Sequence, residues 1–310
     1  METEQAIREG RYFERIEGKK HTLKEAIERY LSEYPCDGMR RCHFKRWRGR
    51  IGETVLADIS PVLINDIIKL WKEEPNDRGE IRQGSTLNRH ITSLSCVFTA
   101  AVRDWGWTSK NPVRDVRRQK EPKGRIRFLS DEEREKLLTA CKESDCPYLY
   151  LVVVLALSTG MRKAEILNLK WSEVDLTRGA IVLYKTKNKE PRRVAIRGLA
   201  LELLKKHSAV RRLDTELLFP GELSPKNGRP FDIRKAWEAA RGKAKLENFV
   251  FHDLRHSCAS YLAMGGATLL EIAEVLGHKT LDMVRRYAHL AESHTAGVVE
   301  RMNQRIFRGS

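Results

Sequence analysis

The sequence predicts an α+β protein, mainly helical, with an N-terminal helical domain and a mixed C-terminal domain that holds a small antiparallel sheet. Apolar residues recur at helical spacing through the first hundred residues, and a basic stretch with proline and glycine follows them. Strand-like alternation appears around residues 180–196. At 310 residues and 41% hydrophobic content, the chain is long enough to bury two cores.

The charge balance indicates a polyanionic partner. The chain has 58 Lys and Arg against 42 Asp and Glu, a formal net charge of +16. Nucleic acid is the leading candidate, ahead of an anionic membrane. The longest apolar run, Tyr148–Leu157, is far shorter than the roughly 20 residues that a bilayer crossing needs. The acidic, Arg-punctuated N-terminus also lacks a signal-peptide core, so we expect a cytoplasmic protein that does not enter a membrane.

The cysteines predict reduced thiols rather than disulfides. They are scattered without a Cys-x-x-Cys pair: Cys36, Cys42, Cys96, Cys141, Cys146 and Cys258. A zinc site built from distant cysteines and histidines stays an alternative, but the spacings that mark such sites are missing. We therefore expect no metal and no cofactor.

Four helices are expected in the N-terminal domain, residues 21–109, after a charged tail at residues 1–20. The first follows the N-cap Thr22, and the second carries a basic segment at residues 40–50. The third runs from Pro61 to Trp71 after Ser60, and the fourth from Thr86 to Trp105. Together they predict a small helical bundle.

The composition of residues 110–127 predicts a basic interdomain linker. Asn-Pro, Glu-Pro and Lys-Gly pairs interrupt the helical pattern there, among many Lys and Arg residues. A solvated surface loop has this composition, and so has a hinge that follows a phosphate backbone. Composition alone does not separate the two.

The second domain, residues 128–310, begins with a helix capped by Ser130. Tyr148–Leu157 is apolar on all sides, as in a helix at the centre of a core, and ends before Gly160. Alternation at residues 180–186 and 192–196 predicts a hairpin around polar residues, and the pattern is helical from Ile233 onward.

Polar residues that suit phosphate chemistry lie in four short segments of this domain. His252 and Arg255 are three apart, so on a helix they share a face and can address one anion. A core histidine or a surface ion pair explains either residue alone. His256 lies four residues after His252, the spacing of helical metal ligands, but the glutamate of the zinc-protease pattern is absent, so metal ligation is the weaker interpretation.

The other segments supply an arginine, a histidine and a tyrosine. Arg162 follows Gly160 at a predicted helix N-terminus, where anions bind well, and Glu165 could support it one turn on. An ordinary surface salt bridge is the alternative. Gly277 is a predicted helix C-cap that directs His278, and Tyr287 follows in a short segment. A tyrosine so placed is, by itself, usually core or surface filler.

Taken in order, these segments resemble the tyrosine recombinase (phage integrase) family. Its signature is an Arg in a Thr-Gly-x-Arg context, a hairpin Lys, a His-x-x-Arg box, a His or Trp after Leu-Gly, and a Tyr soon after. All five occur here in the family's order, between Gly160 and His289. The resemblance covers the second domain well, and the family's helical core-binding domain fits residues 21–109 by pattern.

The resemblance implies a site-specific DNA recombinase, such as a phage or mobile-element integrase, that needs neither metal nor ATP. Tyr287 would attack the scissile phosphate and leave a 3′-phosphotyrosine bond and a free 5′-hydroxyl. Arg162 and Arg255 would stabilise the transition-state charge. Lys187 would protonate the leaving oxygen, with Lys185 and Lys189 as competitors. His252 would assist proton removal from Tyr287, and His278 would hydrogen-bond the phosphate.

The expected partners are double-stranded DNA attachment sites, a tetramer of the chain on DNA, and an accessory directionality factor or a host DNA-bending protein. The expected DNA-contacting residues are Arg41, Lys45, Arg46, Arg48, Arg114, Arg117, Arg118 and Lys120. Family members that bind distant arm sites carry a further N-terminal domain, so this chain is expected to be of the simpler kind or shortened. The C-terminal tail is expected to pack on its own domain or on a neighbouring protomer.

Two other functions stay open. A type IB-like topoisomerase would use the same chemistry as a monomer without choosing a site. A DNA-binding regulator with a degenerate catalytic domain would keep the charge but lose Arg162, Arg255 or Tyr287, and all three are present.

Overall fold

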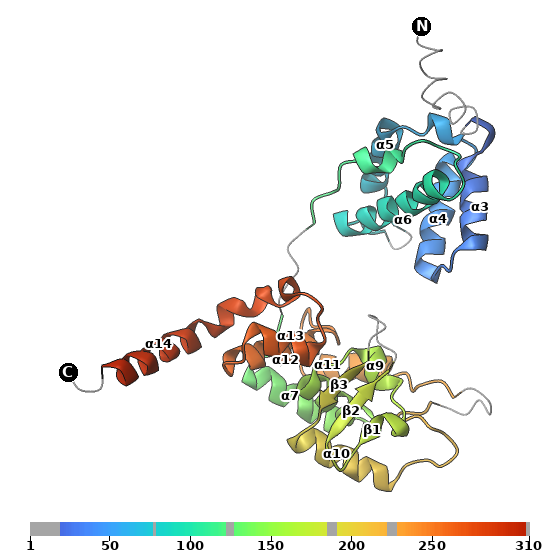
Figure 1. The fold of residues 1–310 in the computed structure, drawn as a ribbon. Helices are drawn as coiled ribbons and strands as arrows, with labels where there is room; N and C mark the ends of the chain where they lie inside the picture. Colours follow the sequence, from blue (N-terminus) through green and yellow to red (C-terminus); the bar gives the residue numbers. More distant parts are fainter. Residues whose placement is uncertain (1–18, 77–78, 122–126, 185–190, 222–227, 308–310) are drawn as a thin grey trace. The chain divides into compact units, whose positions relative to one another are not determined.

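The computed structural model describes residues 19–76, 79–121, 127–184, 191–221 and 228–307. The chain divides into two compact units, Met1–Gly124 and Arg125–Ser310, and each is described by itself (Figure 1). No helix in the described part of the chain is long and apolar enough to cross a membrane.

Unit 1 is a bundle of helices, in agreement with the sequence prediction. Its elements are α3 (Leu23–Glu33), α4 (Gly38–Ile51), η1 (Leu56–Asp58), α5 (Pro61–Glu73), α6 (Gly84–Arg103) and η2 (Pro112–Asp115). Thr22 caps α3 in a capping box with Glu25, and the Ser60 hydroxyl accepts from the amide of Leu63 at the start of α5. One apolar cluster, with Trp47 and Trp71 at its centre, joins the four α-helices.

The start of the segment at residues 110–127 packs on unit 1. Val113 and Val116 are buried in its core, and η2 contacts α5 and α6. Further on, Arg118 donates to the carbonyl of Asn88 at 2.8 Å, and the Asn88 amide donates to the carbonyl of Gln119 at 2.9 Å. The chain is therefore attached to α6 up to this point, and the division between the units falls after Gly124.

Unit 2 is built around one apolar helix. Its helical elements are α7 (Asp131–Lys142), α8 (Leu149–Thr159), α9 (Lys163–Leu167), η3 (Trp171–Glu173), α10 (Gly198–Ala209), α11 (Arg234–Lys243), α12 (Asp253–Met264), α13 (Leu269–Leu276), η4 (Leu281–Met283), η5 (Arg285–Ala291) and α14 (Glu292–Ile306). The apolar α8 packs against α7, α10 and α12, and most of its side chains are buried. Ser130 caps α7 in a capping box with Glu133, as the sequence predicts.

A three-stranded antiparallel sheet lies beside these helices. Its order is β1 (Val174–Asp175), β2 (Ala180–Leu183) and β3 (Arg192–Ala195). Ile181 pairs with Val194, and Leu183 pairs with Arg192, so β2 and β3 form the predicted hairpin. The predicted fold class is confirmed. The turn that carries Lys187 lies outside the described residues.

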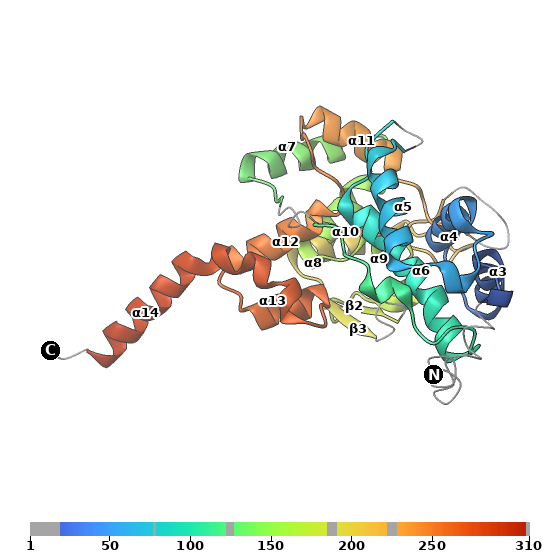
Figure 2. The same cartoon turned by 90° about the horizontal axis from the view of Figure 1, so that it is seen from above.

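A second apolar cluster in unit 2 holds Tyr287. It joins side chains of α12 and α13, including Ala259 and Leu276, to Val284, which directly precedes η5. Beyond η5, α14 runs outward in both views (Figures 1 and 2). Since α12 also packs against the central helix α8, the tyrosine is held by the same framework that holds the His-x-x-Arg box.

Candidate active site

Arg255 lies at the centre of the candidate site and connects its separate segments. Its side chain comes from α12, and the residue is only 4% exposed. The guanidinium donates to the carbonyl of Gly160 at 2.6 Å and to the carbonyl of Leu276 at 2.7 Å. It also donates to Nε2 of His278 at 2.8 Å. One buried arginine therefore brings the end of α8, the end of α13 and the histidine that follows α13 to one place.

Two glycines permit this convergence. Gly160 ends α8 with φ +60°, and a Cβ atom there would lie 2.3 Å from Cδ2 of Leu276. Gly277 ends α13 with φ +66°, and a Cβ atom there would lie 2.5 Å from Cδ and Nη1 of Arg192. Both positions combine left-handed backbone with close approach, which glycine tolerates best. Gly277 is thus the predicted C-cap, and the segment behind it lies against β3.

Arg162 is placed at the N-terminus of α9, as predicted, and is held by Glu165. The Arg162 amide and guanidinium donate to the two Glu165 carboxylate oxygens at 2.8 and 2.6 Å. Nη2 of Arg192 approaches the same carboxylate at 3.4 Å, and its Nη1 donates to the carbonyl of Val275 at 3.3 Å. Figure 2 shows the corresponding elements, β3 and α13, in unit 2. Glu165 therefore binds two arginines from different parts of the chain.

The site carries an excess of positive charge. Burial acts to raise the pKa of Glu165, but its bonds to Arg162 and the charge of Arg192 outweigh this effect and lower it. Burial, with the charges of Arg162 and Arg192 next in size, lowers the pKa of Arg255 to about 10. The three arginines therefore repel one another, and this arrangement favours the binding of an anion between them.

The bond from Arg255 determines the protonation of His278. An arginine can only donate, so Nε2 of His278 accepts and the proton of the neutral ring lies on Nδ1. Burial, with the charge of Arg255 next in size, lowers the pKa of His278 to about 4. The Nδ1 atom is buried and has no hydrogen-bond partner among the described residues. His278 is therefore a neutral donor beside the arginines.

Tyr287 is buried in η5, and its hydroxyl contacts the histidine that directly follows the His-x-x-Arg box. The residue is 1% exposed. Its Oη atom lies 2.5 Å from Nδ1 of His256, which comes from the first half of α12. Burial raises the pKa of Tyr287, against the effect of Arg286 and Arg255. In this structure the hydroxyl is protonated and covered.

The predicted catalytic residues in the described part of unit 2 thus come together, with one difference in detail. His252 is the N-terminal cap residue of α12, and its ring meets the edge of His256 at 5.3 Å between centroids. His252 makes no hydrogen bond to Tyr287 in the described structure, whereas His256 does. Lys187 and its competitors Lys185 and Lys189 lie outside the described residues.

Two site residues were missed by sequence reasoning. His256 was considered only as a metal ligand, and its place four residues after His252 on one helix face was the available signal. Arg192 was interpreted as a hairpin residue, although it is a charged side chain at a partly buried position on the same face of β3 as the buried Val194. No group of three or more His, Cys, Asp or Glu side chains in the described ranges could hold a metal ion.

The predicted DNA-contacting residues lie in unit 1 and differ in their surroundings. Arg41, Lys45 and Arg48 follow one exposed face of α4, at helical spacing. Arg46 packs over the Trp71 ring at 5.1 Å and pairs with Glu74 at 3.6 Å. On the later segment, Arg114, Arg117, Arg118 and Lys120 are exposed. Arg118 also binds α6, so it is partly structural.

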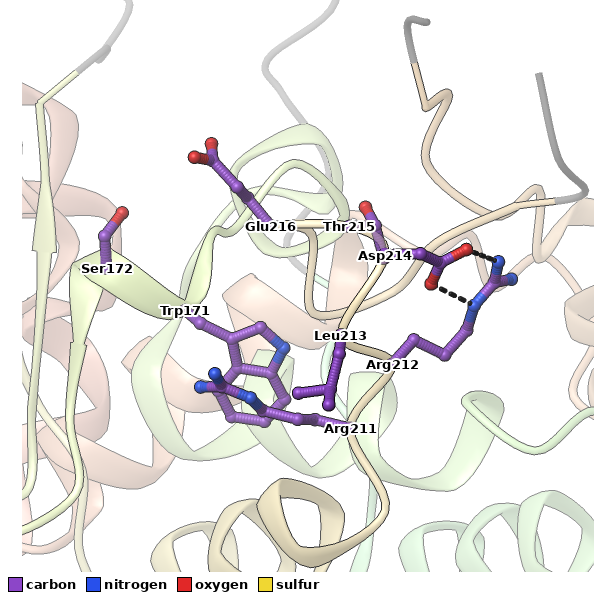
Figure 3. A pocket seen from close by; sticks show the side chains of 8 residues that line it. All are labelled: Trp171, Ser172, Arg211, Arg212, Leu213, Asp214, Thr215 and Glu216. Atoms are coloured by element: carbon purple, nitrogen blue, oxygen red, sulfur yellow. Dashed lines mark hydrogen bonds and ion pairs between the residues drawn. The ribbon is translucent and has the colours of Figure 1, made fainter. Parts of the chain in front are cut away.

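Two surface hollows occur in the described part of the chain. One, of about 490 Å³, is lined by Trp171, Ser172 and residues 211–216 of unit 2. Figure 3 shows Arg211 lying over the Trp171 ring, at 5.9 Å from its centre, and Arg212 paired with Asp214. The other lies in unit 1 beside Asn88 and Arg118. Neither is lined by a predicted catalytic residue.

Comparison with known proteins agrees with this arrangement. The sequence pattern of the Phage integrase family matches residues 127–294. The integrase of Salmonella phage P22 is 35% identical over 235 residues, 73% of this chain and 59% of that protein. The shufflon-specific DNA recombinase of Escherichia coli is 34% identical over 213 residues, 67% of this chain and 51% of that protein. The matches thus take in less than two thirds of either relative.

Solved structures share the fold over most of the chain. The Tn1549 transposon integrase in complex with transposon right end DNA superposes with a TM-score of 0.74 at 16% identity, covering 91% of this chain and 99% of that one. A lambda integrase fragment, crystallised as a dimer bound to a core site, gives a TM-score of 0.67 at 23% identity, covering 86% and 95%. At these identities the likeness supports the fold alone. Together with the family pattern over more than half of the chain, the arrangement of Arg162, Arg255, His278 and Tyr287 shows that this protein belongs to the phage integrase, or tyrosine recombinase, family.

Proposed function

We propose that this protein is a site-specific DNA recombinase that cuts and rejoins DNA through a 3′-phosphotyrosine bond to Tyr287. The observation that carries the proposal is the excess of positive charge beside the tyrosine. Arg162 and Arg192 bind the carboxylate of Glu165, and burial together with the charges of these two arginines lowers the pKa of Arg255 to about 10. A phosphodiester would supply the missing negative charge and place its phosphorus within reach of a buried tyrosine.

Each predicted catalytic residue has a proposed role. Arg162 and Arg255 hold the non-bridging oxygens and stabilise the charge of the pentavalent transition state, which is the part that a metal ion plays elsewhere. His278 donates a hydrogen bond to the phosphate, and Glu165 orients Arg162. Lys187 protonates the leaving 5′-oxygen, and His252 assists proton removal from Tyr287. The phosphotyrosine bond conserves the energy of the cut bond, so rejoining needs no ATP.

The partners are proposed on the same basis. Double-stranded attachment sites would be contacted by the basic residues of unit 1: Arg41, Lys45, Arg46, Arg48, Arg114, Arg117, Arg118 and Lys120. Recombination between two duplexes would require four copies of the chain, and an accessory directionality factor or a host DNA-bending protein would select the direction. The DNA-bound relatives support the first of these proposals.

The decisive test is covalent capture of DNA. The protein is incubated in EDTA, without ATP, with a library of nicked genomic duplexes, and the DNA that stays attached in detergent is sequenced. The wild type should capture one recurrent site, and peptide mapping should find the phosphate on Tyr287. Tyr287→Phe should bind DNA equally well, since it loses no charge, and capture nothing.

Other outcomes would overturn the proposal. Capture without any recurrent sequence, together with relaxation of supercoiled plasmid, would show a topoisomerase. Specific binding without capture by either protein would show a regulator. For the acid role, Lys187→Ala should cleave slowly, and a 5′-bridging sulfur in the substrate should restore the rate, because a thiolate leaves without a proton. If sulfur does not restore it, another residue is the acid.

A further inference from the structure

The hydrogen bond between His256 and Tyr287 has no part in the roles proposed so far. Nδ1 of His256 lies 2.5 Å from Oη of Tyr287, the atom that would attack phosphorus. The two residues come from α12 and η5, which pack against each other, so the contact is set by the fold rather than by neighbouring positions in the chain. The His252 ring, one helical turn earlier, lies nearly perpendicular to the His256 ring in an edge contact, with 5.3 Å between the ring centroids.

The direction of this hydrogen bond follows from what surrounds it. The Tyr287 hydroxyl has no other hydrogen-bond partner among the described residues, and the residue is 1% exposed. A buried hydroxyl proton without an acceptor is costly. If Tyr287 donates to Nδ1, that proton has its acceptor, and the proton of the neutral histidine ring lies on Nε2. His256 therefore already accepts the proton that must leave when Tyr287 attacks.

We propose that His256 is a catalytic residue of strand cleavage and takes the hydroxyl proton of Tyr287 at its Nδ1 atom. This inference rests on the proposed recombinase function. As the bond between Oη and phosphorus forms, the bond between phosphorus and the 5′-oxygen breaks, and that oxygen receives a proton from the proposed acid Lys187. In rejoining, the 5′-hydroxyl gives its proton back to Lys187 as it attacks phosphorus, the bond between phosphorus and Oη breaks, and Oη receives the proton that His256 holds. His252 acts through His256 as a positioning residue.

The electrostatics of the pair explain why the proton stays on the tyrosine until DNA arrives. Burial, with the effect of His252 next in size, lowers the pKa of His256 to about 4. Burial raises the pKa of Tyr287. The charged and titratable groups that act on His256 are His252, Asp253 and Arg255 of α12 and Arg286 of η5, with Tyr287 itself. A bound phosphodiester adds negative charge, which favours a protonated His256.

The test separates a proton acceptor from a group that only orients the tyrosine. His256→Asn places an amide oxygen near the position of Nδ1, so it keeps a hydrogen-bond acceptor but cannot take a proton. His256→Ala keeps neither. His252→Asn tests the neighbouring histidine, and His289→Asn is the matched control, since His289 is exposed on η5. The substrate is the captured site with a 5′-bridging sulfur, which removes the need for an acid.

Cleavage by the wild type should be independent of pH between about pH 6 and pH 8, because His256 is already neutral. Both His256 variants should cleave roughly a hundredfold more slowly at pH 7. Their rates should rise about tenfold per pH unit, as the ionised fraction of Tyr287 does. His289→Asn should match the wild type. DNA affinity and thermal unfolding, measured in parallel, should stay close to wild type for His256→Asn.

Several results would overturn the inference. Wild-type rates in His256→Asn would show that an acceptor is enough and that His256 only orients the tyrosine. A slow rate that does not change with pH would indicate a structural effect. If His252→Asn instead cleaved slowly with a rate that rises with pH, and His256→Asn cleaved at the wild-type rate, His252 would be the proton acceptor. Failure of the wild type to form any adduct would instead refute the recombinase function, so the two failures are distinguishable.

Discussion

Arg192 and Gly277 are in such close contact that Gly277 has no room for a side chain. A Cβ atom on Gly277 would lie 2.5 Å from both Cδ and Nη1 of Arg192. Through the same guanidinium, β3 is connected to Glu165 and to the carbonyl of Val275. The strand that follows the Lys187 turn is thereby attached to the helix end that directs His278.

Substitution of Gly277 should separate backbone strain from this contact. Gly198→Ala is the matched control, because Gly198 also has positive φ, +52°, but nothing lies within 4 Å of its Cβ position. We expect Gly198→Ala to lower the free energy of unfolding by about 1 kcal/mol. Gly277→Ala should lower it by about 2 to 4 kcal/mol and reduce DNA cleavage. Denaturant titration measures both.

A double-mutant cycle identifies the cause. In an Arg192→Ala background, Gly277→Ala should cost no more than Gly198→Ala, because the crowding atoms are gone. An unchanged cost in that background would mean that the loss at Gly277 comes from its backbone alone.

Removal of the Glu165 charge should disorganise the arginines. Glu165→Gln leaves Arg162 and Arg192 without their shared carboxylate, so we expect cleavage of the captured site to fall by about 10- to 100-fold. Glu25→Gln is the control, since Glu25 occupies the equivalent capping-box position of α3 in unit 1. If both variants lost the same amount of cleavage activity, Glu165 would act only as a helix-capping residue.

The exposed stripe on α4 should determine part of the salt dependence of DNA binding. Replacing Arg41, Lys45 and Arg48 together by alanine should lower the slope of log affinity against log salt by about 3. Affinity should fall for all sequences alike, as measured by fluorescence anisotropy on the captured site and on unrelated DNA.

The control for this change replaces two exposed lysines of α5, Lys69 and Lys72, by alanine. A similar change of slope in that variant would place the contact surface elsewhere on unit 1. A loss confined to one DNA sequence would contradict a role in backbone contact.

Unit 1 should lose stability in acid because of its buried histidines. Burial, with the effect of His43 next in size, lowers the pKa of His90 to about 3, and the rings of the two histidines lie 4.2 Å apart. An unfolded histidine has a pKa of about 6.5, so below that pH the unfolded chain binds a proton that the folded chain excludes. The stability is thus complete above about pH 6.5 and falls as the pH decreases towards about 3.

Unfolding followed by tryptophan fluorescence at several pH values measures this loss, since Trp71 lies 5.0 Å from the His90 ring. His90→Asn should reduce the dependence of the free energy of unfolding on pH by the equivalent of about one bound proton per molecule. His289→Asn should leave that pH dependence unchanged. An identical slope in His90→Asn would assign the acid sensitivity to other groups.

Local sequence patterns were sufficient for the helices and for the hairpin. Thr22, Ser60 and Ser130 each cap the helix that they precede, because a hydroxyl followed by free backbone amides is a local arrangement. Gly277 ends α13 with positive φ for an equally local reason. The packing of Val113 and Val116 on unit 1 was not apparent, because two apolar residues in a basic segment give no periodic signal.

The sequence by itself determined which residues have the chemistry for phosphate transfer, since their order and spacing identify the motif from Arg162 to Tyr287. Tertiary structure alone decided that Arg255 donates to the carbonyls of Gly160 and Leu276, that Arg192 shares Glu165, and that His256 rather than His252 meets the hydroxyl of Tyr287. These contacts join segments up to 95 positions apart. Spacing along the chain describes neighbours within one helix or strand, whereas contacts between elements depend on how their buried faces pack.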